Sequence, residues 1–194
     1  TPIQAELICY DVNGIQIVFG VTEENELKLF HFSRAPFDAE NLCRKPDNWW
    51  PMEGMREAQI KESFQLVQVN FSGYNRPYEK HGNKYIVTAP GFMLKFDSIS
   101  EERDENGDVL RIVQKDGVTG AKVESVLQFY DGLSIARMYN TVTNEGNEDQ
   151  TLEYISSFSY WGIEKEQKEG IPEFISSDDK MSMVVVHNGW QKEL

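Results

Sequence analysis

Apolar and polar residues alternate along most of the chain in short runs, and turn-forming residues separate one run from the next. Alternation with a period of two is typical of β-strands that bury one face. Short strands at this spacing predict an all-β fold of antiparallel strands, a sandwich or barrel with little helix. The predicted strands are Ala5–Asp11, Gly14–Val21, Glu26–Phe32, Phe64–Phe71, Lys84–Thr88, Phe92–Ser98, Val109–Lys115, Ala121–Tyr130, Leu133–Thr143, Thr151–Trp161 and Met181–His187.

Asparagine, aspartate and glycine mark the turns between these strands. The strongest signal is Val12-Asn13-Gly14, because asparagine followed by glycine accepts the positive φ angles of a two-residue hairpin turn. Alternation within Glu26–Phe32 also predicts which way its side chains point. Leu27, Leu29 and His31 are expected on one face of that strand, and Lys28, Phe30 and Phe32 on the other.

Two longer stretches interrupt the strand pattern. Ser33–Glu62 contains three prolines and the pair Trp49-Trp50, whereas Glu164–Asp179 is rich in Glu, Lys and Ser. A connection as long as the first is usually functional or disordered, and its aromatic content argues against disorder. We expect one or two helical turns inside each stretch.

Composition and charge narrow the function classes. The chain has 194 residues, 40% of them hydrophobic, which suits a single domain with a real core. Nineteen basic residues against 32 acidic ones give a net charge of −13, which argues against nucleic acid and anionic membrane surfaces as partners. Because the N-terminal residues show no signal peptide, we expect a cytoplasmic protein. Its two cysteines, Cys9 and Cys43, are expected to be buried, reduced thiols.

No motif predicts a metal, a cofactor or a catalytic nucleophile. The three histidines, His31, His81 and His187, are far apart in sequence and none has a second ligand at metal-binding spacing. Cys43, which precedes Arg44-Lys45, is more simply incidental than reactive, and Asn70-Phe71-Ser72 is more simply a chance tripeptide than a glycosylation acceptor. Among 32 acidic residues, nothing selects a pair for glycoside hydrolysis.

The aromatic residues of Ser33–Glu62 are the best candidates for ligand binding. Trp49 and Trp50 offer flat apolar faces that can cover the C–H face of a sugar, and Asp38 and Asp47 offer acceptors for its hydroxyl groups. The alternative is that the two indoles close the end of the sandwich. Substrate binding by Asp38, Asp47, Trp49 and Trp50 is therefore a hypothesis from residue types alone.

The end of the chain carries a resemblance to a known family. Val184–Glu193 contains Gly189-Trp190-Gln191-Lys192-Glu193, which resembles the Gly-x-Trp-x-Arg/Lys-Glu signature closing the N-terminal domain of family 36 glycoside hydrolases, the bacterial α-galactosidases. Three earlier segments resemble the family in the expected order: Leu27–Phe32, Gln68–Pro77 and Arg137–Gly146. The resemblance spans nearly the whole chain, except that Ser33–Glu62 departs from the family pattern.

The resemblance implies a fold and a function. The fold is a β-supersandwich like that of galactose mutarotase, spanning residues 1–194, with a (β/α)8 barrel downstream that carries both catalytic carboxylates. The chain itself is then non-catalytic, and its parent is a retaining α-galactosidase acting on melibiose or raffinose. The partners implied are the chain's own barrel, met by Trp190, Lys192 and Glu193, and further copies of the enzyme. Ser33–Glu62 corresponds to the loop that reaches a neighbouring subunit's active site.

Two other functions stay open. A free-standing carbohydrate-binding module is supported by the same loop aromatics. A mutarotase-like enzyme is the third possibility, because a supersandwich can place a histidine and a glutamate that open a sugar ring. The scattered histidines and the short chain weaken this third possibility.

Overall fold

The structure is a computed structural model that describes residues 5–37, 39, 64–74 and 89–160. The chain divides into two compact units, Thr1–Trp161 and Gly162–Leu194. All described residues belong to the first unit.

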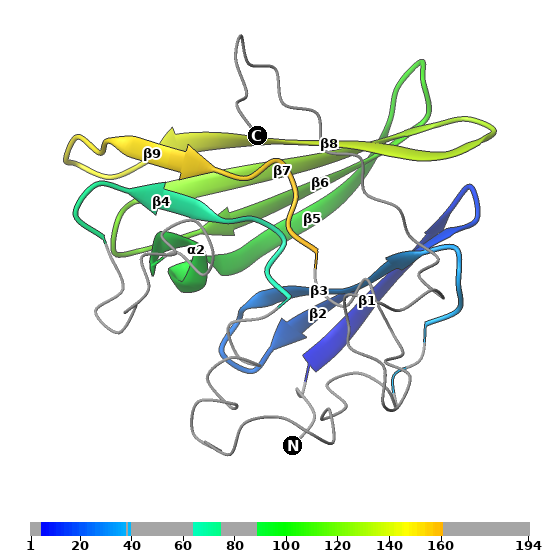
Figure 1. The fold of residues 1–194 in the computed structure, drawn as a ribbon, viewed down its shortest axis with the longest axis horizontal. Helices are drawn as coiled ribbons and strands as arrows, with labels where there is room; N and C mark the ends of the chain where they lie inside the picture. The colour runs from blue at the N-terminus through cyan, green and yellow to red at the C-terminus, as the bar shows by residue number, and fades with distance from the viewer. Residues whose placement is uncertain (1–4, 38, 40–63, 75–88, 161–194) are drawn as a thin grey trace, which may run out of the picture. The chain divides into compact units, whose positions relative to one another are not determined.

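The described part is an all-β assembly of antiparallel sheets, as the alternation predicted (Figure 1). One sheet has the order β1 (Ala5–Val12), β2 (Ile15–Thr22) and β3 (Leu27–Ser33). A second sheet pairs β4 (Val69–Phe71) with β9 (Leu152–Ile155). The third, four-stranded sheet follows the chain: β5 (Lys95–Arg103), β6 (Asp108–Lys115), β7 (Ala121–Tyr130) and β8 (Leu133–Asn144).

Three predicted segments differ from the observed strands. Only Val69–Phe71 of the run Phe64–Phe71 is strand, and only Leu152–Ile155 of Thr151–Trp161. Phe92–Ser98 is wrong at both ends, because the helix α2 (Ala89–Met93) precedes the strand β5, which continues to Arg103. Lys84–Thr88 and Met181–His187 lie outside the described residues.

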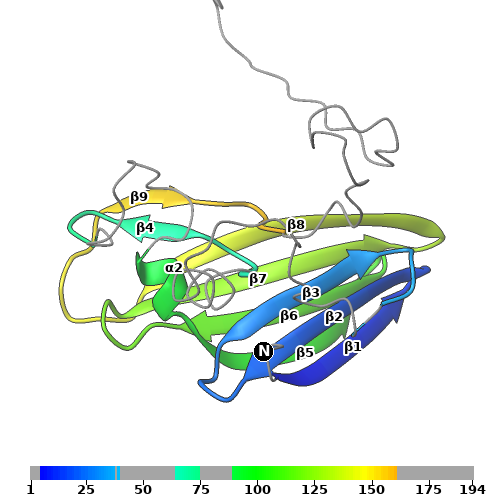
Figure 2. The same ribbon diagram turned by 60° about the horizontal axis from the view of Figure 1, so that its bottom comes forward.

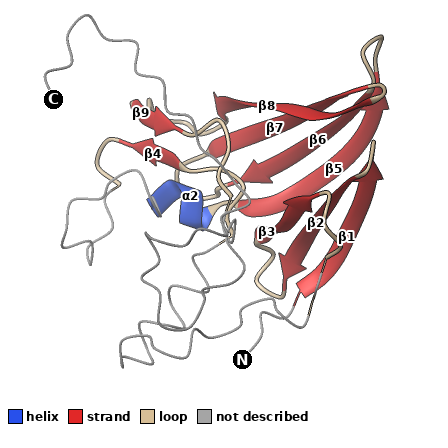
Figure 3. Cartoon of the chain, turned by 45° about the vertical axis from the view of Figure 1, so that its right-hand side comes forward, coloured by secondary structure: helices blue, strands red, loops and turns tan. Residues whose placement is uncertain are grey.

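Helix α2 was not expected at this place, since the predicted helical turns were assigned to the two long stretches. Pro90 lies in its first turn, where a fixed φ favours helix and the missing N–H costs nothing. The helix contacts β4 (Figure 3). The apolar run Phe92-Met93-Leu94 therefore gave a false start to the predicted strand.

Two apolar clusters form the core. The larger one joins the three-stranded sheet β1–β3 to the four-stranded sheet β5–β8, both drawn in Figure 2. Its fully buried side chains include Phe19, Leu29, Ile112 and Phe129. The smaller one lies under the β4–β9 pair, where Val69, Phe71, Leu94, Ala121 and Val123 are buried with Val67. Burying a side chain of this size stabilises the fold by roughly 1.5–3 kcal/mol, so these clusters dominate its stability.

A β-bulge in β3 overturns the predicted facing of that strand. Val18 pairs with His31 and Phe19 pairs with Leu29, so Phe30 is an extra residue without a partner in β2. Because one residue is inserted, the alternation reverses after it. Phe32, not His31, packs against the core beside Leu29.

Gly20 makes room for the bulge. A β-carbon on Gly20 would lie 2.1 Å from Cε2 of Phe30, so only a hydrogen fits between the strand and the ring. The Phe30 ring also meets Phe64 edge to face, with centroids 5.5 Å apart. Residues on both faces of β3 are consequently buried, and the buried set includes Lys28 and His31.

Candidate functional site

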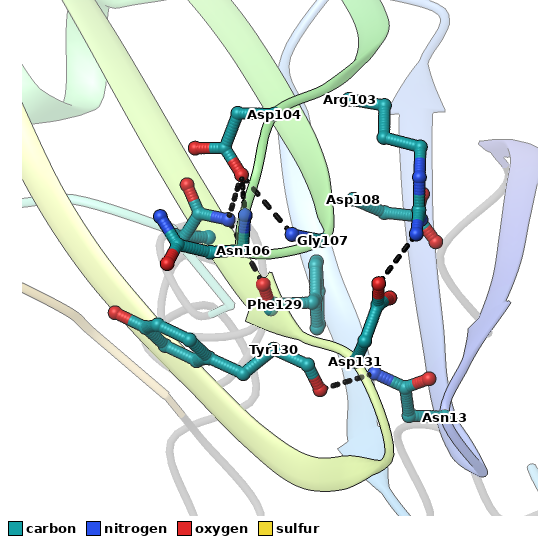
Figure 4. Close-up of polar contacts among 10 residues, drawn as sticks. Asn13, Arg103, Asp104, Asn106, Gly107, Asp108, Phe129, Tyr130 and Asp131 are labelled. Atoms are coloured by element: carbon teal, nitrogen blue, oxygen red, sulfur yellow. Dashed lines mark hydrogen bonds and ion pairs between the residues drawn. The ribbon is translucent and has the colours of Figure 1, made fainter.

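Three hairpin turns meet at one end of the described unit: residues 13–14, 104–107 and 131–132 (Figure 4). Asn13 Nδ2 donates to the carbonyl of Tyr130 at 2.8 Å, and Ser134 Oγ donates to the carbonyl of Asn13 at 2.8 Å. The amide of Asp131 donates to the carbonyl of Asn106 at 2.9 Å. These bonds tie the turn of the three-stranded sheet to two turns of the four-stranded sheet, and we call this region the hairpin end.

Charged groups stiffen the hairpin end. Arg103 pairs with Asp108 at 2.7 Å and also with Asp131 (Figure 4). The pair Arg103–Asp131 links two of the turns. Asp104 accepts hydrogen bonds from the amides of Asn106 (2.8 Å) and Gly107 (3.1 Å). The amide of Asn106 is the main cause of the lowered pKa of Asp104, so this carboxylate stays ionised.

A second arginine holds two carboxylates on the four-stranded sheet. Arg111 on β6 binds Glu102 at 3.1 Å and Glu124 at 2.7 Å. Hydrogen bonding to Arg111 lowers the pKa of Glu102, and the same bond to Glu102 is the main cause of the raised pKa of Arg111. Glycoside hydrolysis needs one carboxyl group that is protonated at working pH. The lowered pKa of Glu102 makes this carboxylate unsuited to the role of that acid.

An aromatic cluster forms where β3 ends, and it consists of Phe32, Phe158 and Tyr160. Phe158 and Tyr160 are stacked with centroids 6.0 Å apart, and Phe32 meets Phe158 edge to face at 5.5 Å. The hydroxyl of Tyr160 accepts a hydrogen bond from the amide of Phe32 at 3.2 Å, which fixes the ring. Phe158 is 37% exposed, so this cluster is partly open to solvent.

The segment 33–37, which follows β3, is bonded to the three-stranded sheet. Ser33 pairs with Gln16 of β2, and Gln16 Oε1 accepts a hydrogen bond from the amide of Phe37 at 3.1 Å. The ring of buried His31 lies 5.6 Å from that of Phe37, and its Nε2 donates to the carbonyl of Ala35 at 2.7 Å. The short segment 33–37 thus has a defined path against Gln16 and the ring of His31.

Every residue predicted from the sequence to bind substrate or a second domain lies outside the described residues: Asp38, Asp47, Trp49, Trp50, Trp190, Lys192 and Glu193. Two described residues, Phe37 and Tyr160, adjoin these stretches in the sequence. Asp38 directly follows Phe37, and Tyr160 is the last described residue before the stretch that contains Trp190. Tyr160, which precedes the second stretch, belongs to the aromatic cluster, whereas Phe37, which precedes the first, packs on His31.

Sequence reasoning missed the aromatic cluster itself. The signal was Phe158-Ser159-Tyr160 inside the predicted strand Thr151–Trp161, because residues two apart in an extended chain lie on one face. Phe32 was assigned to the wrong face of its strand, since the bulge at Phe30 cannot be read from the alternation. Without Phe32 no cluster could be assembled.

The predictions for the cysteines, the histidines and the tripeptide Asn70-Phe71-Ser72 can also be compared with the structure. Cys9 is exposed, contrary to the predicted buried thiol, and Cys43 lies outside the described residues. His31 is a satisfied buried histidine, while His81 and His187 are outside the described part. Asn70 is buried and donates to Glu153 at 2.8 Å, and Ser72 binds the same carboxylate, so this tripeptide serves the β4–β9 pair.

Comparisons with known proteins add no assignment, because no family model, no curated protein and no solved structure matches the chain. Among the described residues, no group of three or more His, Cys, Asp or Glu side chains is placed to hold a metal ion. The described part also contains no helix with the length and apolar character needed to cross a membrane.

Proposed function

We propose that the chain is a non-catalytic β-domain of a carbohydrate-active hydrolase of the α-galactosidase type, and that the aromatic cluster supports its sugar-binding edge. The observation that carries this proposal is the cluster of three rings, Phe32, Phe158 and Tyr160, where β3 ends. Aromatic rings bind sugars by covering their C–H faces, and Phe158 is the most exposed residue of this cluster.

The proposed role is supportive rather than catalytic. In the parent enzyme, Asp38, Asp47, Trp49 and Trp50 contribute to one edge of the active site of a neighbouring subunit, which requires a homo-oligomer. Trp190, Lys192 and Glu193 contact the barrel that carries the nucleophile and the acid/base. Glu102 supports this division of labour, because its hydrogen bond to Arg111 lowers the pKa of its carboxyl group.

A mutarotase-like activity has less support. Such an enzyme needs a histidine that is free to exchange a proton with the sugar. His31 is 2% exposed and uses Nε2 in a hydrogen bond to the carbonyl of Ala35, so it does not serve as that base.

A free-standing carbohydrate-binding module is the second candidate function, and the exposure of Phe158 favours it. The two candidates differ in what the coding sequence holds beyond Leu194. A barrel-sized continuation of the reading frame supports the hydrolase domain, and a stop codon with sugar binding by the chain alone supports the module.

Sugar titration followed by NMR tests the binding surface. Methyl α-galactoside and melibiose should shift the resonances of Phe158 and Tyr160, and Phe158→Ala should weaken binding about fivefold or more, which corresponds to roughly 1 kcal/mol. Tyr139→Ala is the matched control, because Tyr139 is an exposed aromatic residue of β8 outside the cluster.

An assay with an aryl α-galactoside tests the proposal that the chain itself is not catalytic. The purified chain should release no product above buffer. Turnover that disappears when a carboxylate of this chain is replaced would overturn the proposal, as would equal binding by the Phe158→Ala and wild-type proteins.

A further inference from the structure

The sequence contains three Asn-Gly pairs, Asn13-Gly14, Asn106-Gly107 and Asn188-Gly189, and the first two are in described turns. In such a pair the glycine nitrogen can attack the side-chain carbonyl of the asparagine, since no β-carbon on the glycine blocks the approach. The reaction needs a glycine N–H that is free to lose its proton and a peptide that can rotate. The two described pairs differ in the glycine N–H, whereas the asparagine carbonyl accepts a hydrogen bond in both.

The glycine of the pair Asn13-Gly14 is open, although Asn13 itself is bonded to Tyr130 and Ser134. Both residues are exposed and form a two-residue turn between Val12 and Ile15, with positive φ angles of 53° and 78°. A β-carbon built on Gly14 would meet no atom within 4 Å, so the space around it is free. Within the described residues, the Gly14 amide donates no hydrogen bond.

The pair Asn106-Gly107 is closed. The amide of Gly107 donates to Oδ1 of Asp104 at 3.1 Å, and the carbonyl of Gly107 accepts from the amide of Asp104 at 3.0 Å. Gly107 is buried, and a β-carbon on it would lie 2.7 Å from the carbonyl oxygen of Phe129. The carbonyl of Asn106 is held by the amide of Asp131. The nucleophile is therefore occupied and its peptide is fixed on both sides.

We propose that Asn13 is a site of spontaneous deamidation in the folded protein and that Asn106 is protected by Asp104. The deprotonated amide nitrogen of Gly14 forms a bond to Cγ of Asn13, and Nδ2 leaves as ammonia after taking up a proton. The resulting succinimide is opened by water at either carbonyl, which yields aspartate or isoaspartate. One water is consumed and one ammonia released, with no change of oxidation state.

The modification acts on the bond that joins two sheets. Nδ2 of Asn13 donates to the carbonyl of Tyr130, and a carboxylate at position 13 has no hydrogen to donate. It adds a negative charge at the hairpin end, where Asp131 already neighbours Tyr130. Deamidation should therefore loosen the contact between the β1–β2 turn and the β7–β8 turn.

Peptide mapping by mass spectrometry after incubation of the full chain at mildly alkaline pH tests the proposal. In the folded protein the peptide with Asn13 should deamidate at least ten times faster than the peptide with Asn106, a difference in activation free energy of about 1.4 kcal/mol. In denaturant the two rates should converge, because the protection of Asn106 depends on the fold. Equal rates in the folded protein, or an unchanged difference in denaturant, would overturn the proposal.

Two variants sharpen the test. Asp104→Ala removes the acceptor of the Gly107 amide, so the Asn106 rate should rise several-fold while circular dichroism shows a folded chain. If this variant is unfolded, the comparison of folded and denatured wild-type protein decides. Asn13→Asp reproduces the product, and it should lower the melting temperature by about 2–4 °C through the lost hydrogen bond; an unchanged melting temperature would contradict the expected loosening.

Discussion

Strands β3 and β7 both contribute to the core, but β7 is buried mainly on one face and β3 on both. In β7, buried residues alternate with half-buried ones such as Lys122 and Glu124 along most of the strand, because one face of its sheet stays near solvent. In β3, five consecutive residues are buried, and Lys28 is among them. A strand covered on both faces has no polar side, so its charged residues must find partners inside.

The partner of Lys28 is Glu26. Its Oε2 lies 3.4 Å from Nζ of Lys28, and its Oε1 lies 3.2 Å from Nζ of Lys95. Burial is the largest influence on Lys28 and lowers its pKa, and the attraction of Glu26 only partly offsets it. Strand β7 needs no such arrangement, since its charged residues reach solvent. The difference shows that double-sided burial costs stability that the core must offset.

The largest effect is expected where the two sheets meet. Phe19→Ala removes a fully buried ring that packs edge to face on Tyr10, so it should cost about 3–5 kcal/mol of unfolding free energy. Denaturant titration measures this. The control Ile135→Ala, on the exposed strand β8, should change stability by no more than about 0.5 kcal/mol. Equal losses would mean that the two sheets do not share one core.

The next effect concerns the bulge that distinguishes β3. Gly20→Ala places a methyl group against the ring of Phe30, so it should destabilise the protein by about 1–3 kcal/mol. The double variant Gly20→Ala with Phe30→Leu should recover part of this loss, because the two positions are in contact. Gly117→Ala is the control, since its β-carbon meets nothing within 4 Å. Additive losses in the double variant would refute the predicted clash.

The buried lysine predicts a pH dependence. Because the folded state lowers the pKa of Lys28, the unfolded chain binds its proton more tightly, and stability should rise with pH between the lowered folded pKa and the ordinary value near 10.4. Lys28→Met should remove this rise and be neutral or stabilising by about 1 kcal/mol at neutral pH.

Stability should be measured only below about pH 10, because above it the ionisation of Tyr10 lowers stability and opposes the rise expected from Lys28. Burial is the main cause of the raised pKa of Tyr10, so its ionisation in the unfolded chain lowers stability at higher pH. Chemical denaturation of both proteins across the alkaline range provides the comparison. A wild-type curve as flat as that of Lys28→Met would show that Lys28 is not held in an unfavourable charged state.

The smallest effect is expected on the open face of the four-stranded sheet. Arg111→Gln breaks the contacts to Glu102 and Glu124, and because these groups are partly exposed the loss should stay below about 1 kcal/mol. The loss should shrink further at high salt, where exposed charges are screened. Thermal melts at low and high ionic strength check this. A salt-independent loss would mean that Arg111 acts through packing of its aliphatic stem.

How far the sequence predicts the fold depends on local environment. The span of β7 agrees with the prediction residue for residue, and β1, β2, β6 and β8 differ only at their ends, because one-sided burial and Asn-Gly or Asp-Gly turns give strong local signals. The segment 64–68 was predicted as strand, but it makes scattered backbone hydrogen bonds instead of a ladder, with Leu29 donating to Phe64 and Ser159 to Leu66. Its buried glutamines bond to each other, Gln68 Nε2 donating to Oε1 of Gln65 at 2.6 Å. Such side-chain pairing leaves no periodic trace.

The candidate site could likewise be predicted from the sequence only in part. Period-two spacing could have suggested that Phe158 and Tyr160 share a face, since that depends only on an extended backbone. Their meeting with Phe32, more than a hundred residues earlier, depends on how the bulge at Phe30 turns β3. The predicted ligand residues Asp38, Asp47, Trp49 and Trp50 stay predictions.

Three properties of this protein can be read from its amino acids alone: it is all-β, most of its hairpins turn where expected, and its charge is strongly acidic. They depend on alternation, turn chemistry and counted charges, which are local. Three others required the folded chain: the face that Phe32 occupies, the burial of Lys28 against Glu26, and the shielding of Asn106 where Gly14 is open. Each of these depends on contacts between residues distant in the chain or on a single inserted residue, and the free energy of such contacts exceeds the preferences that a short stretch of sequence can express.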